Sequence, residues 1–233
     1  MFLQCLSQFY AQKHAVCEED YLKWKKISNQ QITEDGELVS YSLDQLKGDS
    51  YLYIQQTSPF RLDSFERASE AFFPLNHKFA VFKITPGYDT LRNLKLKKVK
   101  KSKWPKDTLG IYNFSNNLII KEPGLQSFAI AEEGNTFAFI QEVETEKKTG
   151  LFSALFNSEK NNSEKKEKIL KVYCSYPFKS FDQPNVKSFT LSPNGKRIAY
   201  IESVKDKNDK ISERLIVKRT KDGEVINTFS LLQ

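Results

Sequence analysis

The chain has 233 residues, enough for one large all-β domain or two small ones. Hydrophobic residues make up 39% and aromatic residues 13%, mostly Phe and Tyr, which excludes a disordered chain and suits β-strands. The net charge of +7, from 36 Lys and Arg against 29 Asp and Glu, permits binding to anionic surfaces without establishing it. No apolar run reaches the ~18 residues that a transmembrane helix needs, so we expect none.

Residues 1–17 form an N-terminal arm in this interpretation. Met1–Lys13 is apolar, with a small residue at Ala11 before a polar one, but it lacks a basic start and a full apolar core. Two hypotheses stay open: the remnant of a truncated secretory signal peptide, or a frayed arm. The first predicts a secreted or periplasmic protein, and the second leaves a cytoplasmic location open.

The three cysteines, Cys5, Cys17 and Cys174, form no C-x-x-C pair and have no histidine cluster nearby, which argues against a zinc site. A disulfide between Cys17 and Cys174 is conceivable in an oxidising compartment. The interpretation that we favour is two unpaired, buried thiols.

The segment Glu18–Ile27 predicts a short helix, because three acidic residues open it and lysines follow near its end. Tyr21, Trp24 and Ile27 recur every three residues. We expect this aromatic stripe to pack against a sheet.

A repeat then dominates the chain. Four times an apolar segment enters a polar turn and ends, five residues past the turn, on an aromatic side chain. The spacing between successive turns is 41, 57 and 61 residues, counted between residues 36, 77, 134 and 195. A period of about 40 to 50 residues with strands and tight turns is typical of β-propeller blades. The copies are Ile32–Tyr41, Phe73–Phe82, Ile130–Phe139 and Leu191–Tyr200.

The turn residue is glycine in three copies and His77 in the second. Tight hairpin turns need a positive φ, which glycine adopts at low cost and histidine tolerates better than most residues. His77 has no second ligand or catalytic partner near it in the sequence, so we interpret it as part of an altered turn.

Each hairpin is followed by a segment with alternating apolar residues, which predicts a third strand. In the last copy, an Asp-Gly turn at Asp222 leads into a fourth strand, Val225–Phe229. The sequence therefore predicts an all-β domain over 18–233: a partial β-propeller of about four blades, each a four-stranded antiparallel sheet, preceded by a short N-terminal helix. The expected units are about 28–60, 65–118, 124–178 and 185–233.

Two insertions lengthen the middle units. Seven lysines lie between Lys95 and Lys106 around Trp104, which predicts a solvated loop anchored by Trp104-Pro105; stacking on a nucleic-acid base or contact with a membrane interface is the alternative. The second insertion, 142–168, contains the apolar cluster Gly150–Phe156 and predicts a projecting hairpin or a partly disordered loop that docks on a partner.

Enzyme motifs are missing from the sequence: it contains no G-x-S-x-G, H-E-x-x-H, G-x-x-x-x-G-K or G-x-G-x-x-G. The histidines are His14, in the arm, and His77, in a turn, and neither suits a Ser-His-Asp triad. We therefore expect no catalytic, cofactor-binding or metal-binding residues, and no enzymatic activity of this chain by itself.

Taken together, these segments resemble the N-terminal propeller of the prolyl oligopeptidase family of serine peptidases, especially its secreted bacterial branch. The resemblance spans nearly the whole chain and rests on Glu18–Ile27, Ile32–Tyr41, Lys47–Ile54, the Lys-rich insertion ending at Asp107, and Phe189–Tyr200. It implies an α/β-hydrolase domain carrying Ser, Asp and His, which this chain does not contain, and seven or eight blades in place of four.

The resemblance implies a non-catalytic module that restricts access of large substrates to a hydrolase domain, with peptides as substrates. A stand-alone propeller-like scaffold that binds a protein partner, similar to TolB or WD40 proteins, is the alternative. Binding of nucleic acid or an anionic surface by Lys95–Lys106 is a weaker third hypothesis.

Overall fold

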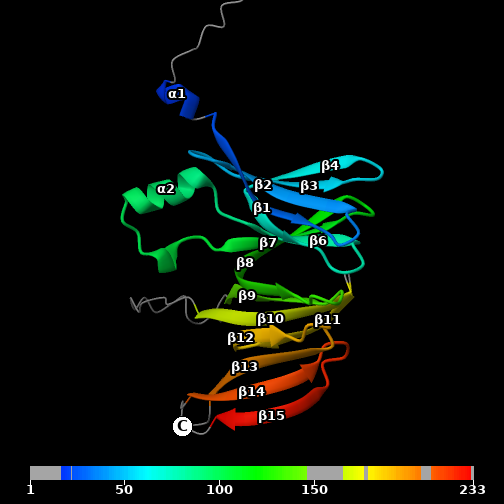
Figure 1. The fold of residues 1–233 in the computed structure, drawn as a ribbon. Helices are drawn as coiled ribbons and strands as arrows, with labels where there is room; N and C mark the ends of the chain where they lie inside the picture. The colour runs from blue at the N-terminus through cyan, green and yellow to red at the C-terminus, as the bar shows by residue number, and fades with distance from the viewer. Residues whose placement is uncertain (1–16, 22, 146–164, 176–177, 206–210, 232–233) are drawn as a thin grey trace, which may run out of the picture.

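In the computed structural model, the described residues are 17–21, 23–145, 165–175, 178–205 and 211–231. They form antiparallel β-sheets stacked one on another along the chain (Figure 1). The first sheet has the strand order β1-β2-β3-β4. Its strands are β1 (Lys25–Ile32), β2 (Leu38–Gln45), β3 (Tyr51–Gln56) and β4 (Arg61–Glu66).

The second sheet has seven strands, which run in chain order from β5 at one edge to β11 at the other. They are β5 (Ala68–Phe72), β6 (Phe79–Ile84), β7 (Asp107–Asn113), β8 (Leu118–Ile130), β9 (Phe137–Thr145), β10 (Lys165–Ser175) and β11 (Phe178–Pro184). The third sheet, ordered β12-β13-β14-β15, consists of β12 (Val186–Leu191), β13 (Arg197–Lys205), β14 (Ile211–Arg219) and β15 (Val225–Leu231).

The seven-stranded sheet is two four-stranded units that share β8. This strand pairs with β7 from Leu118 to Leu125 and with β9 from Leu125 to Ile130. Gly124, with φ of 80°, lies just before this change of partner. The predicted all-β class and the antiparallel four-stranded units are therefore confirmed, with the second and third units joined by hydrogen bonds into one sheet.

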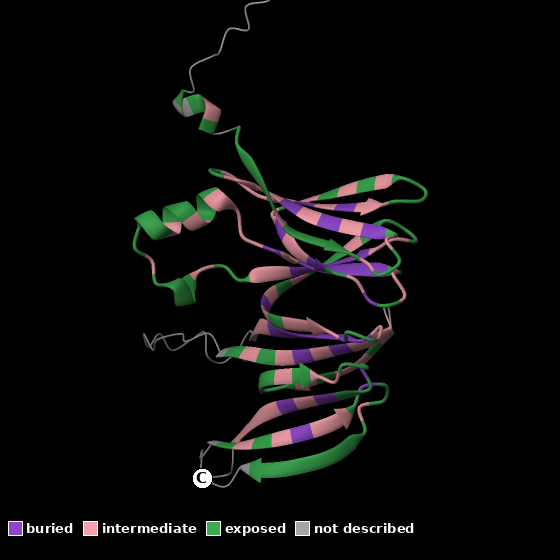
Figure 2. Cartoon of the chain, in the orientation of Figure 1, coloured by how far each residue is buried: buried purple, intermediate pink, exposed green. Residues whose placement is uncertain are grey.

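Three apolar layers hold the units together. Leu52 and Ile54 of β3 pack with Ala80 and Phe82 of β6 between the first and second units. The opposite face of β6 enters the layer between the second and third units, which also contains residues of β7 and β9. Ile140, Leu170, Tyr200 and Ile216 are among the residues of the layer between the third and fourth units. In β6, β7 and β9 consecutive residues are buried, so both faces of these strands are covered, and this explains their near-continuous apolar runs. Figure 2 shows buried residues in purple along strands of the middle units.

The prediction for Glu18–Ile27 was wrong in its extent and in its packing. The helix α1 (Glu18–Tyr21) has a single turn, and β1 begins at Lys25. Trp24 and Ile27 are 54% and 61% exposed. A helix this short is marginal in water, whereas pairing with β2 satisfies the backbone of Lys25–Ile27 directly.

The lysine-rich insertion lies between β6 and β7, but it is helical where a loop was predicted. It contains α2 (Tyr88–Leu96) and the 3₁₀ turn η1 (Lys101–Lys103), which project to one side of the stack in Figure 1. The indole nitrogen of Trp104 donates to the carbonyl of Val99 at 2.9 Å, so the tryptophan does anchor the segment. The described helices are too short and too polar to cross a bilayer.

Three further predictions concern the turn glycines, the cysteines and the N-terminal arm. Gly36 and Gly195 have the positive φ that their turns require, whereas Gly134 does not.

Cys17 and Cys174 are free. Cys17 is exposed and Cys174 is half-buried, so the expectation of two buried thiols was wrong. Several predictions fall on residues outside the described part of the chain: the signal-peptide hypothesis for the N-terminal arm, Cys5, His14, and the apolar cluster Gly150–Phe156.

Candidate functional site

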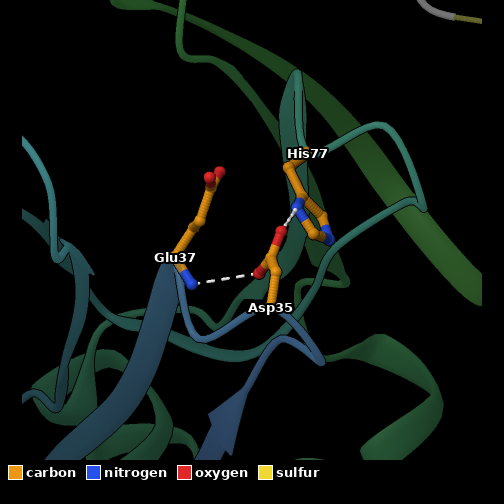
Figure 3. A group of neighbouring side chains, drawn as sticks. All are labelled: Asp35, Glu37 and His77. Carbon is orange, nitrogen blue, oxygen red and sulfur yellow. Dashed lines mark hydrogen bonds and ion pairs between the residues drawn. The ribbon is translucent and has the colours of Figure 1, made fainter.

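A polar group joins the turns of the first two units (Figure 3). Asp35 lies in the β1–β2 turn and His77 in the corresponding β5–β6 turn, where its φ is 48°. His77 Nδ1 lies 2.8 Å from Asp35 Oδ2. Equivalent turns of two successive repeats thus bring an imidazole and a carboxylate together from positions 42 residues apart in the sequence; His77 takes the place that Gly36 has in the first repeat, and Asp35 is the residue before Gly36.

Asp35 accepts hydrogen bonds from its own turn as well. The hydroxyl of Thr33 donates to Oδ1 at 2.6 Å, and the backbone N–H of Glu37 donates to the same oxygen at 3.0 Å. These donors, the Thr33 hydroxyl first, then the Glu37 N–H and then His77, hold the pKa of Asp35 below its ordinary value of 3.8. The carboxylate therefore stays charged beside His77 at neutral pH.

Asp35, Glu37 and His77 place three potential metal-ligand atoms within 4.8 Å of one another. Both oxygens of Asp35 already accept hydrogen bonds, and His77 Nδ1 is engaged with one of them. Of the three, Glu37 alone has a side chain with no hydrogen-bond or ion-pair partner among the described residues, and no dashed line reaches its carboxylate in Figure 3. This arrangement is a polar contact that aligns two turns, and a cation would have to displace it.

The sequence contained one signal for this contact, the equivalence of the two turns that carry Asp35 and His77, because equivalent turns of adjacent propeller units lie side by side. His77 was interpreted as an altered turn, which its positive φ supports. Within the described part of the chain, no hydrogen bond connects His77 to a serine, threonine or cysteine side chain, as a nucleophile-base pair would require.

A pocket of about 570 Å³ lies within the helical insertion. Cationic side chains surround its apolar part. Tyr88 of α2 and Trp104 are the aromatic residues of its lining. The lining residues are Tyr88, Leu91, Arg92, Lys95, Lys98, Val99, Lys101 and Trp104. The sequence identified the lysines and Trp104 as a group, but placed them in a loop without a pocket.

A second pocket, of about 590 Å³, lies beside the turns of the third and fourth units and is lined by Cys174, Gly195 and Thr220, among others. The Cys174 thiol contacts the carbonyl of Thr220 at 2.8 Å, and the Thr220 hydroxyl donates to the carbonyl of Gly195 at 2.6 Å. Arg219 at its rim is paired with Asp222 and Glu224. These polar groups are mutually satisfied and connect the two units.

No family model and no curated protein sequence matches the chain. Among solved structures, it is similar to acylaminoacyl peptidase from Pyrococcus horikoshii, with 12% identity and a TM-score of 0.47, over 92% of this chain and 33% of the peptidase. The β-propeller domain of the Trilobed protease from Pyrococcus furiosus gives 9% identity and a TM-score of 0.47, over 90% of this chain and 58% of that one.

TolB from Acinetobacter baumannii is similar at 13% identity and a TM-score of 0.37, over 86% of this chain and 45% of TolB. The chain spans about a third of the length of the acylaminoacyl peptidases that it matches.

Proposed function

We propose that this chain is the non-catalytic N-terminal propeller portion of a serine peptidase of the prolyl oligopeptidase family, and that it limits access of large substrates to a hydrolase domain. The sequence resemblance supports the family. The observation that carries the proposal is that the first and the third sheet each have an apolar outward face that no other sheet of the described residues covers.

The first terminal face is on the first sheet. Leu38, Ser40 and Ser42 of β2 point inward and are buried, so the residues between them point outward. Across the outward face, Ile27, Leu43 and Tyr51 are aligned on three adjacent strands, and Tyr41 stacks on Tyr53 with ring centroids 5.3 Å apart.

The third sheet repeats this pattern at the other end of the stack. Tyr200 and Ile216 point into the layer shared with the third unit. The outward row aligns Ile201, Leu215 and Phe229 on β13, β14 and β15. Faces of this composition are covered by a neighbouring sheet everywhere else in the stack, so further blades are the expected neighbours.

Reading the coding sequence after the codon of Gln233 tests the family part of the proposal. An open frame that contains G-x-S-x-G followed by Asp and His supports it. A natural stop codon directly after Gln233 would contradict it.

The gating role is tested by deleting residues 18–233 from the complete peptidase and comparing the sizes of the substrates that the two forms cleave. We expect the deletion to permit cleavage of long or folded substrates while short peptides are still cleaved, with a nucleophile-to-Ala variant as the control for peptidase activity. Unchanged size selection in a deletion variant that still cleaves short peptides would rule out the gating role.

We further propose export to the periplasm or cell exterior, supported by the apolar start of the chain. Fractionation of cells that express the protein from its complete reading frame would test this, and recovery in the cytoplasm alone would oppose it.

A second candidate is a stand-alone scaffold for a protein partner, which the basic pocket of the insertion favours. A stop codon after Gln233, combined with a stable monomer of this chain, would support the scaffold over the peptidase portion.

A further inference from the structure

The helical insertion carries the entire net charge of the protein. Residues 88–106 contain eight Lys and Arg residues and one acidic residue, Asp89, which gives a net charge of +7. The whole chain has 36 basic and 29 acidic residues, also +7, so the other residues contain 28 of each sign and are neutral together. Charge this localised produces a strong positive potential at one place on the surface.

The cations that line the pocket are not neutralised by nearby carboxylates. Arg92, Lys95, Lys98 and Lys101 line the pocket, and none has an acidic partner within ion-pair distance among the described residues. Elsewhere in the fold, some of the described Lys and Arg residues do have an acidic partner. Examples are Lys83 with Glu70 at 2.7 Å, Lys171 with Glu122 at 3.0 Å, Arg61 with Asp63 at 2.9 Å and Arg219 with Asp222 at 2.9 Å.

The pocket has a fixed frame. At one end of α2, the backbone N–H of Tyr88 donates to the carboxylate of Asp49 in the β2–β3 connection at 2.7 Å. At the other end, the bond from Trp104 to Val99 closes the segment that carries η1. Leu91, Val99 and Trp104 are partly buried and form the apolar floor, while the four cations stand exposed around it.

We propose that this pocket binds an acidic segment of a partner protein, with carboxylates on the four cations and one apolar side chain on the floor. Three of the four cations are lysines, which act as point charges, whereas phosphate sites favour bidentate arginines and free backbone N–H groups. The first N–H group of α2 is already bonded to Asp49, Lys95 lies in the last turn of the helix, and Lys98 follows its end. The site therefore suits carboxylates better than the phosphates of a nucleic acid.

The test uses the full chain and a short fluorescein-labelled peptide that contains several glutamates around a central leucine, with binding followed by anisotropy. The variant Lys95→Glu/Lys98→Glu/Lys101→Glu should weaken binding about tenfold or more. Its matched control, Lys25→Glu/Lys121→Glu/Lys168→Glu, makes the same charge change at exposed lysines outside the insertion and should bind as the unaltered chain does. Circular dichroism checks that both variants are folded.

Two further measurements identify the class of ligand and show whether it binds at the pocket. The peptide with every glutamate replaced by glutamine should not bind, and a labelled oligothymidylate or phosphatidylserine vesicles should bind more weakly than the acidic peptide at the same ionic strength. In a Trp24→Phe background, Trp104 is the sole tryptophan, and its emission should change on addition of the acidic peptide.

Equal weakening by the two triple variants would overturn the proposal, because binding would then depend on net charge alone. Tighter binding of the oligothymidylate or the vesicles would assign the pocket to that ligand class and overturn it as well. These outcomes are independent of whether the peptidase proposal holds.

Discussion

At the scale of single residues, Asp35 contributes to the dependence of stability on pH. Its pKa in the folded chain lies below 3.8, because the Thr33 hydroxyl, the Glu37 N–H and His77 favour the charged form. A depressed pKa stabilises the folded state above the unfolded-state pKa, and this stabilisation is lost as the pH falls through the folded-state pKa. The window for Asp35 therefore lies below about pH 4.

The variant Asp35→Asn should accordingly unfold at a lower urea concentration than the unaltered chain at neutral pH, and the difference should shrink as the solution is acidified below about pH 4. Urea denaturation at a series of pH values measures this. Glu37→Gln is the control, because Glu37 donates to Asp35 through its backbone N–H and not through its side chain. A difference between Asp35→Asn and the unaltered chain that stays constant with pH would contradict the prediction.

Two buried serines of β2 are expected to reduce stability. The hydroxyls of Ser40 and Ser42 are buried without a hydrogen-bond partner in the described structure. We expect Ser40→Ala and Ser42→Ala each to raise the free energy of unfolding by about 1 kcal/mol, since a buried hydroxyl without a partner is costly. Ser28→Ala should lower it, because the Ser28 hydroxyl donates to Asp44. Chemical denaturation compares the three, and destabilisation by all of them would show that the buried hydroxyls are satisfied.

At the scale of elements, β8 is where two units become one sheet, and Gly124 makes this possible. A Cβ at Gly124 would lie 2.3 Å from the carbonyl oxygen of Glu142, and the residue also has a positive φ. Gly36 has a similar φ of 71°, but a Cβ there would meet nothing within 4 Å. A side chain at Gly36 would therefore meet only the conformational cost of a positive φ, whereas one at Gly124 would meet a steric clash as well.

We expect Gly36→Ala to lower the free energy of unfolding by about 1 kcal/mol, the cost of a left-handed alanine. Gly124→Ala should lower it by about 3 kcal/mol, because the β8 and β9 backbones must also move apart. Equilibrium unfolding in urea of the two variants measures the difference. Equal losses would mean that the close approach at Gly124 relaxes without cost.

The repeat allowed much of this fold to be predicted from sequence. The turn and aromatic spacing located β2, β6, β9 and β13, because alternation and hairpin turns are local properties. Other features depend on distant contacts. The continuity of β8 and the recruitment of Lys25–Ile27 into β1 are set by strand pairing, which composition does not reveal. The contact of Asp35 with His77 likewise arises from the stacking of two units.

At the scale of the whole molecule, the insertion and the terminal faces are different kinds of surface. The insertion concentrates positive charge, and its partner is expected to be polar and acidic. The outward faces of the first and third sheets are apolar and resemble the internal layers, so another sheet is their natural neighbour. Salt should therefore weaken binding at the insertion, whereas contacts at the terminal faces should be insensitive to salt or strengthened by it.

This difference predicts the behaviour of the chain in solution. Because no other sheet covers either outward face in the described structure and their apolar side chains are only partly buried, we expect the chain to self-associate with increasing concentration, and more so at high salt. Tyr41→Lys/Tyr53→Lys places two charges on the outward face of the first sheet and should shift the chain toward the monomer. Sedimentation velocity over a concentration series measures the distribution.

The matched control for this pair is Phe60→Lys/Leu75→Lys. These side chains are 71% and 59% exposed in connections away from the outward faces, so the control removes two apolar groups and adds the same two charges. Association should persist in the control and fall in Tyr41→Lys/Tyr53→Lys if the sheet face is responsible. Equal loss in both variants would instead attribute association to general surface hydrophobicity. A chain that stays monomeric at every concentration and salt level would show that the half-buried rings of Tyr41 and Tyr53 already shield this face, since stacking removes much of their surface from water.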